Sequence, residues 1–250
     1  MTKKSEVTMD ILSEIKEKRE IQLEKEKKVY KRPSFRDALK QEGLKIIGEI
    51  KRASPSKWKI ANDSFNLLNQ AKYYVENGVA AFSILTEEEY FKGDNEFIKT
   101  VSENFPHIPI LRKDFIYTPF QVAHAKFLGA SAILLIVRML NDEELHTLHH
   151  LAHELELDVL VEIHDKNELE RALKITDLQI LGINNRNLNT FNTDIKTTGE
   201  LIKFIPEEIL KNIVLVSESG FLSKDDLKYA ENLNVDALLI GEALMKGLLF

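Results

Sequence analysis

Ile46-Ile47-Gly48-Glu49-Ile50-Lys51-Arg52-Ala53-Ser54-Pro55-Ser56 is an apolar run that ends in a turn, and its pattern recurs along the chain. The apolar residues are typical of a strand, and Ser-Pro-Ser predicts a turn because proline cannot continue the ladder of backbone hydrogen bonds. Side chains on a strand alternate between its two faces, so Glu49 and Lys51 share one face. An ion pair on a surface strand would explain this spacing alone. The recurrence of the pattern favours a shared interior site instead.

Eight apolar runs of this kind occur, and each ends in polar residues or glycine. They span Ile46–Arg52, Ala81–Thr86, Ile108–Phe115, Ala132–Arg138, Asp158–His164, Ile180–Arg186, Ile213–Ser219 and Ala237–Gly241. Helical segments with N-terminal capping signals lie between several of them, at Thr118, Asn141, Asp165 and Ser223, and Gly78 and Gly129 predict helix ends.

Strands that alternate with helices pair in parallel, because each crossover returns the chain to the same end of the sheet. Eight such units predict a closed (β/α)8 barrel, the TIM barrel, and 250 residues is a typical length for it. The alternative is an open, doubly wound sheet. No Gly-x-Gly-x-x-Gly motif follows the first run, which makes the alternative less favourable.

Residues 1–45 precede the barrel and predict an N-terminal helical extension. Residues from about Ser5 to Tyr30 alternate Glu and Lys around scattered Ile and Leu, which indicates an exposed helix with charge pairs, or a disordered tail in its first few residues. A shorter helix is predicted after the break at Pro33. We interpret residues 1–250 as one barrel domain, with the barrel over 46–250 and a last helix that is cut short after Met245.

Composition excludes several classes of function. The formal net charge of -6 argues against a nucleic-acid partner, because phosphate contacts need clustered Lys and Arg. The chain has no cysteine, so disulfides and thiolate chemistry are excluded. It has neither an apolar leader segment nor a run long enough to cross a membrane, so we expect a cytoplasmic protein without a membrane partner. Four histidines, at positions 146, 149, 150 and 153, share one predicted helix, but no acidic partner converges on them and we expect no metal.

Polar residues gather at the carboxyl ends of the runs, where barrels of this kind carry their active sites. By alternation, the pairs that share a face are Glu49 and Lys51, Lys113 and Phe115, Glu162 and His164, Asn184 and Arg186, and Ser217 and Ser219. Buried charges are costly unless they are paired or used, so this collection predicts a ligand and proton transfer. Glycines at Gly220 and Gly241, with the Ser54 turn nearby, predict a phosphate site.

Taken in order, these residues resemble the indole-3-glycerol phosphate synthase family. The motifs that carry the resemblance are Glu49–Ser56, Leu85–Gly93, Leu111–Phe115, Val161–Asp165, Gly182–Leu188, Val216–Gly220 and Ile240–Met245. The resemblance implies a carboxy-lyase of tryptophan biosynthesis. It would convert 1-(2-carboxyphenylamino)-1-deoxyribulose 5-phosphate to indole-3-glycerol phosphate, carbon dioxide and water, with this sugar phosphate as its small-molecule partner. The family uses no cofactor or metal, and we expect a monomer or weak homo-oligomer.

The resemblance also implies roles for individual residues. Lys113 corresponds to the general acid, and Lys51 to the group that holds the substrate carboxylate. Glu49 and Glu162 divide the roles of base and of stabilising positive charge, and Asn184 would bind a substrate hydroxyl and orient Glu49. Ser219 completes the polar set, the phosphate would lie against Ser54, Gly220, Gly241 and Glu242, and the remaining substrate contacts would be Pro55, Phe91, Phe115, Leu134, Ile136, Arg186 and Leu188.

Two features depart from the family pattern: Trp58 stands where glycine is usual, and the last helix is short, which would leave apolar surface exposed or covered by a partner. Two other functions fit the same scaffold. One is a Schiff-base aldolase that uses Lys113 or Lys51 as nucleophile. The other is a non-catalytic barrel that binds sugar phosphates.

Overall fold

A computed structural model describes residues 11–53, 65–187 and 190–249, without the side chains of residues 24–30. Contacts group the chain into two compact units, residues 1–31 and 32–250. The first unit contains helix α1 (Ile11–Tyr30). Its Lys18 ammonium lies 2.6 Å from the Glu14 carboxylate one turn earlier, as the alternating charges predict. The part of the predicted helix before Ile11 lies outside the described residues.

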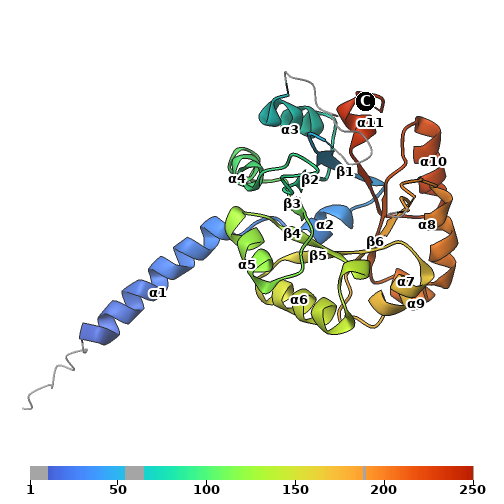
Figure 1. The fold of residues 1–250 in the computed structure, drawn as a ribbon. Helices are drawn as coiled ribbons and strands as arrows, with labels where there is room; N and C mark the ends of the chain where they lie inside the picture. The colour runs from blue at the N-terminus through green and yellow to red at the C-terminus, as the bar shows by residue number, and fades with distance from the viewer. Residues whose placement is uncertain (1–10, 54–64, 188–189, 250) are drawn as a thin grey trace, which may run out of the picture. The chain divides into compact units, whose positions relative to one another are not determined.

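The second unit is a closed barrel of eight parallel strands in chain order, which confirms the predicted (β/α)8 fold (Figure 1). The strands are β1 (Lys45–Ile50), β2 (Ala81–Leu85), β3 (Ile110–Lys113), β4 (Ala132–Ile136), β5 (Asp158–Ile163), β6 (Ile180–Asn184), β7 (Val214–Glu218) and β8 (Ala237–Ile240). Seven predicted runs contain one strand each, the first run misses only Lys45 of β1, and every run extends past the carboxyl end of its strand. The residues that follow each strand no longer pair with a neighbouring strand. They form the carboxyl-terminal end of the barrel, which we call the rim.

Helices surround the strands, except for α2, which lies across the amino end of the barrel (Figure 1). They are α2 (Phe35–Leu39), α3 (Leu67–Glu76), α4 (Asn95–Asn104), α5 (Pro119–Leu128), α6 (Asp142–Glu154), α7 (Lys166–Ala172), α8 (Lys196–Leu201), α9 (Glu207–Leu210), α10 (Lys224–Asn232) and α11 (Glu242–Met245), with 3-10 turns η1 (Val137–Met139) and η2 (Ile202–Phe204). The predicted caps are confirmed: Thr118, Asn141 and Ser223 form capping boxes, and Asp165 accepts from the Glu168 amide. Gly129 ends α5 in the left-handed conformation, with φ 91°.

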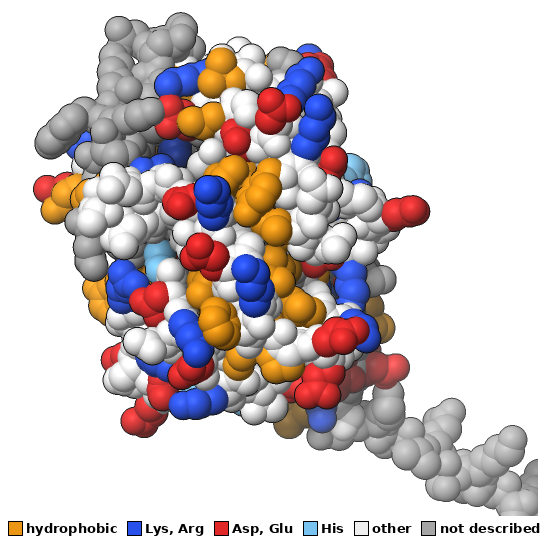
Figure 2. Space-filling model, turned by 90° about the vertical axis from the view of Figure 1, so that its right-hand side faces the viewer, with side chains coloured by type: hydrophobic (Ala, Val, Ile, Leu, Met, Phe, Trp, Pro, Cys, Tyr) orange, Lys and Arg blue, Asp and Glu red, His pale blue; other side chains and the backbone are white. Residues whose placement is uncertain are grey.

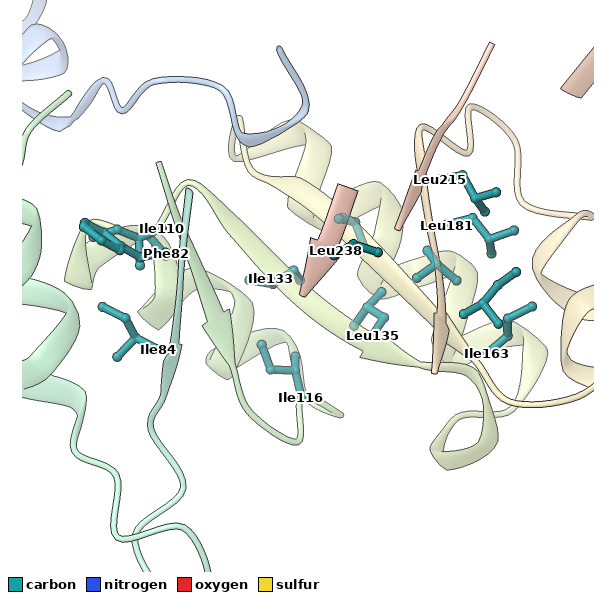
Figure 3. Close-up of a cluster of buried hydrophobic side chains, with 14 of the residues drawn as sticks. Phe82, Ile84, Ile110, Ile116, Ile133, Leu135, Ile163, Leu181, Leu215 and Leu238 are labelled. Atoms are coloured by element: carbon teal, nitrogen blue, oxygen red, sulfur yellow. The ribbon is translucent and has the colours of Figure 1, made fainter. Parts of the chain in front are cut away.

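The apolar core has two layers. The outer layer lies between the strands and the helices, and Figure 3 shows part of it, including Phe82, Ile133 and Leu238. The inner layer fills the barrel at its amino end. There α2 contributes Phe35 and Leu39, both fully buried. The Ser34 hydroxyl at the start of α2 donates to Asp158 over 3.0 Å, which fixes the helix to the first residue of β5. The amino end is therefore closed, and the carboxyl end is left to form a site.

The expected exposure of β8 beside the short last helix is not found. Leu238 and Ile240, on the outer face of β8, are 0% and 3% exposed. They belong to the same core cluster as Leu244 and Leu249, which follow them in the chain. Leu248 is the large apolar side chain of residues 242–249 that stays exposed. The outer face of β8 is therefore covered by residues of the chain itself.

The surface over α8 and α10 carries interspersed acidic and basic side chains, with apolar side chains in a band between them (Figure 2). Charges of both signs mixed in this way create no extended positive field on this face. In the part of the chain that the structure describes, no helix combines the length and the apolar character needed to cross a bilayer.

Candidate functional site

A cavity of about 460 Å³ opens at the carboxyl ends of the strands. Most of the residues predicted for the site line it: Glu49, Lys51, Phe91, Lys113, Phe115, Leu134, Ile136, Glu162, Asn184, Arg186, Ser219, Gly220, Gly241 and Glu242. Ser54, Pro55 and Leu188, together with Trp58, lie outside the described residues. The structure therefore brings together at one rim residues that are up to 193 positions apart, from Glu49 to Glu242.

Lys113 is the centre of the ionic cluster at the bottom of this cavity. Its Nζ atom lies 2.6 Å from Glu162 Oε2 and 3.1 Å from Glu218 Oε2. These side chains extend from β3, β5 and β7, and Glu49 extends from β1. In barrels of this kind, alternate strands point their side chains inward at the same level, which explains why charges from odd-numbered strands meet.

Burial and charge act against each other in this cluster. Burial disfavours the charged form of Lys113, but the carboxylates of Glu162, Glu218 and Glu49 outweigh it, so the pKa of Lys113 is raised. Burial likewise disfavours ionised Glu162, but Lys113 and His164 outweigh it and the pKa of Glu162 is lowered. The pKa of Glu218 is raised to about 8. Burial is the main cause and the Glu162 carboxylate adds to the rise, while the Lys113 ammonium opposes it. The cluster thus holds an ammonium, a carboxylate and a carboxyl group that is protonated near neutral pH.

Glu49 and Lys51 form a second pair on the same rim. The Lys51 Nζ atom lies 2.5 Å from Glu49 Oε1, as alternation along β1 predicts. Gly241, directly after β8, provides the space for this pair. A Cβ atom there would lie 2.5 Å from Glu49 Oε1 and 2.9 Å from Lys51 Nζ. The outer layer also supports this pair, because the buried Tyr74 hydroxyl of α3 donates to the Glu49 carbonyl over 3.0 Å.

Glu218 is a candidate site residue that the sequence reasoning missed. In the run Ile213–Ser219, the sequence predicts Ser217 and Ser219 as the side chains that face the site. Ser217 in fact points away from the cavity. On that side of β7 its hydroxyl oxygen lies 2.6 Å from Thr198 Oγ1 and 3.1 Å from Asn185 Nδ2. Ser219 lies beyond the strand with φ 68°, so it no longer follows the alternation. The apolar inward positions Val214 and Val216 could have pointed to Glu218, because a side chain two residues further on faces the same way.

Gly182 on β6 is what leaves room for Glu218. A Cβ atom at position 182 would collide with Glu218 Oε1. We expect Gly182→Ala to push this carboxyl group away from Lys113 and to lower kcat by about ten- to a hundredfold, because small displacements of acid–base groups are costly. Steady-state kinetics measures the change. Gly199→Ala on α8 is the matched control, since its methyl group would meet Tyr229 and Leu233 instead. Equal kcat for the two variants would contradict the proposed importance of this space.

Asn184 contacts a different glutamate from the one that the resemblance implied. Its Nδ2 atom donates to Glu162 Oε1 over 3.2 Å, so in this structure it orients Glu162 and not Glu49. Its Oδ1 atom accepts from the backbone N–H of Arg186 over 3.0 Å. The reason is position: β6 is the direct neighbour of β5, which carries Glu162.

The walls of the cavity differ in character. Phe91 and Phe115 lie with ring centroids 6.1 Å apart and form an apolar wall together with Leu134 and Ile136. Leu85, Phe191 and Leu239 also line the cavity and were not predicted. The wall after β7 and β8 contains Ser219, Gly220 and Gly241, and Gly220 adopts φ 95°. An aromatic group suits the first wall, and backbone N–H groups suit an anion at the second.

A sequence model of the family described as "Indole-3-glycerol phosphate synthase" matches residues 2–248. A protein of that name from Thermoanaerobacter pseudethanolicus is 50% identical over 213 residues, which cover 85% of this chain and 79% of the relative. Another, from Acetivibrio thermocellus, is 45% identical and the match covers 95% of each chain. Among solved structures, 3-hexulose-6-phosphate synthase from Salmonella typhimurium matches with a TM-score of 0.57 at 14% identity, over 80% of this chain and 90% of that chain. This last likeness concerns the fold alone.

Proposed function

The chain belongs to the indole-3-glycerol phosphate synthase family, a group of carboxy-lyases in tryptophan biosynthesis, and we propose that its rim cluster performs the chemistry of that family. The substrate would be 1-(2-carboxyphenylamino)-1-deoxyribulose 5-phosphate. The observation that carries the proposal is the buried ammonium of Lys113 between Glu162 and Glu218, beside an apolar wall that fits an anthranilate ring.

Ring closure comes first and needs an acid. The ring carbon that bears the carboxylate attacks the substrate carbonyl carbon, and the carbonyl oxygen takes a proton from Lys113. The surrounding carboxylates raise the pKa of Lys113, so the resting site holds it as an ammonium that carries the proton needed for this step. An ammonium in a site of low polarity also stabilises the developing negative charge. A Schiff-base aldolase would need its lysine amine to be neutral, so the same raised pKa argues against Lys113 as such a nucleophile.

Decarboxylation and dehydration follow. Carbon dioxide leaves because the positively charged ring nitrogen accepts the electron pair, which restores the aromatic ring. Water is then expelled, with Lys51 as acid and a glutamate as base for the ring proton. Glu162 suits the role of base because it stays ionised. Glu218, with its pKa raised to about 8, carries a proton near neutral pH that it can return to Lys113.

Binding divides between the two walls. The anthranilate ring would lie against Phe91, Phe115, Leu134 and Ile136, with its carboxylate at Lys51. Arg186 lies at the same mouth. The phosphate would lie at Gly220 and Gly241, where backbone N–H groups can approach an anion closely. The family acts on a small phosphate substrate, and a cytoplasmic location and a monomeric or weakly oligomeric state are parts of the same proposal.

Turnover of the carboxyphenylamino substrate by the full chain tests this proposal. We expect the fluorescence of the indole product to appear, and borohydride to trap no covalent adduct. An adduct on Lys113 or Lys51 would support the aldolase instead. Saturable binding of the substrate without product at any enzyme concentration would support a non-catalytic barrel, and either result would overturn the proposal.

A further inference from the structure

Behind Glu162, a line of alternating charges leads out of the site. His164 Nε2 lies 3.2 Å from Glu162 Oε1, and His164 Nδ1 lies 3.0 Å from Glu168 Oε2. Glu168 Oε1 accepts from Arg138 Nε, and Arg138 also donates to Asp165 over 2.8 Å. Together with Lys113 on the other oxygen of Glu162, positive and negative groups alternate from the cavity to the partly exposed pair of Arg138 and Asp165.

The line is built into the fold and is not a chance surface pairing. The side chains of His164, Glu162 and Glu168 are 3%, 2% and 7% exposed. Glu168 also accepts from the His164 backbone N–H over 2.8 Å, and its own backbone N–H is capped by Asp165. The end of β5 and the first turn of α7 therefore hold His164 in one place. Its Nδ1 atom is hydrogen-bonded to Glu168, and its Nε2 atom faces the Glu162 carboxylate at 3.2 Å without an aligned hydrogen bond.

We propose that His164 is a positioning residue, an imidazolium that holds Glu162 ionised and fixed while Lys113 gives up its proton, and that Glu168 in turn holds His164. This inference rests on the proposed function of Glu162 and Lys113. In the resting site Glu162 has two cationic neighbours. When Lys113 donates its proton, the cluster loses one positive charge, and His164 supplies the charge that remains.

The surroundings of the imidazole favour its charged form. Glu162 on β5 and Glu168 on α7 face its two ring nitrogens, while Arg138 of η1 and Lys113 of β3 lie beyond these carboxylates. Burial opposes the charge, but the two carboxylates outweigh it and raise the pKa of His164 to about 9. The charge, and the support it gives to Glu162, is therefore present at neutral pH and is lost as the pH rises through about 9.

The first test reads the charge of His164 directly. In the full chain labelled with ¹⁵N-histidine, NMR should show both His164 ring nitrogens protonated at pH 7.5. Glu168→Gln removes one of the two carboxylates, so the pKa of His164 should fall by about 1 unit or more. A neutral His164 in the wild type at pH 7.5, or an unchanged pKa in Glu168→Gln, overturns the inference.

The second test reads its effect on catalysis. His164→Gln keeps a polar side chain but no charge, and we expect kcat to fall about tenfold with KM changed much less, because Glu162 loses its fixed position. In Glu168→Gln, the alkaline fall of kcat should move to lower pH together with the pKa of His164. His150→Gln is the matched control, since His150 is an exposed histidine on α6, with 78% of its side chain accessible.

The outcomes separate this inference from the function on which it rests. A wild-type chain without turnover overturns the proposed function, whatever the NMR shows. A wild-type chain with turnover, combined with a His164→Gln variant whose kcat and pH profile equal those of His150→Gln, overturns the inference alone. Thermal melts of each variant exclude unfolding as the cause of a lower kcat.

Discussion

Replacing Lys113 with methionine is expected to lower kcat by about a thousandfold, the largest effect we expect from one substitution at the rim. Methionine keeps the length and apolar stem of lysine but has no proton to donate and no charge. The ring-closure step then loses both its acid and its electrostatic stabilisation. Steady-state assay of indole formation by the purified variant measures the loss.

Two controls make this result specific. Lys126→Met on α5 makes the same change on the outside of the barrel, where Lys126 lies 3.5 Å from Glu156, and should leave kcat unchanged. A melt of Lys113→Met checks the fold, because Glu162 and Glu218 are left close together without their cation. A variant that folds, binds substrate and retains kcat within tenfold of the wild type would show that another group is the acid.

Acid is expected to destabilise the barrel through His149, by about 3 kcal/mol in total as the pH falls from 6.5 to 4. Burial, together with His153 and the other histidines of α6, lowers the pKa of His149 to about 4. Its Nε2 atom is buried without a hydrogen-bond partner. The unfolded chain therefore binds a proton between pH 6.5 and 4 that the folded chain does not. Stability is complete above pH 6.5 and is lost as the pH falls through 4.

Urea unfolding of the wild type and of His149→Leu at pH 7.5 and 4.5 measures this effect. Leucine suits the buried position and cannot titrate, so the variant should lose less free energy of unfolding between the two pH values. His150→Leu is the control for an exposed histidine on the same helix. An equal loss in wild type and His149→Leu would contradict the prediction. His164 also titrates between pH 6.5 and 9, but the wild type and His149→Leu both carry it, so its contribution cancels in the comparison.

The order of strands and helices could be predicted from sequence because each element carries its own local signal. The capping residues Thr118, Asn141 and Ser223 sit at the helix starts that they predicted. Strand ends were placed one or two residues too late because polar rim residues continue the alternation after the ladder has stopped. Once closure of the sheet was inferred, most charges at the rim were predictable, since alternation decides which side chains point inward.

What could not be predicted depends on contacts between distant strands. Glu218 was not predicted because the sequence pattern favours Ser217 and Ser219, on either side of it, as the residues on the inward face of β7. The partner of Asn184 depends on the register between β5 and β6, and no local pattern encodes that register. The role of His164 needed the position of Glu168 on α7, and Gly182 gains its importance only when Glu218 lies opposite. In each case the missing information was a distance and not a residue type.

Phe35 and Leu39 close the amino end of the barrel, so substrate and products enter and leave the site through one opening. Whatever enters between the rim residues has to return by the same opening. Carbon dioxide, water and the indole product would therefore leave through the opening by which the next substrate enters. Substrate binding would have to follow product release.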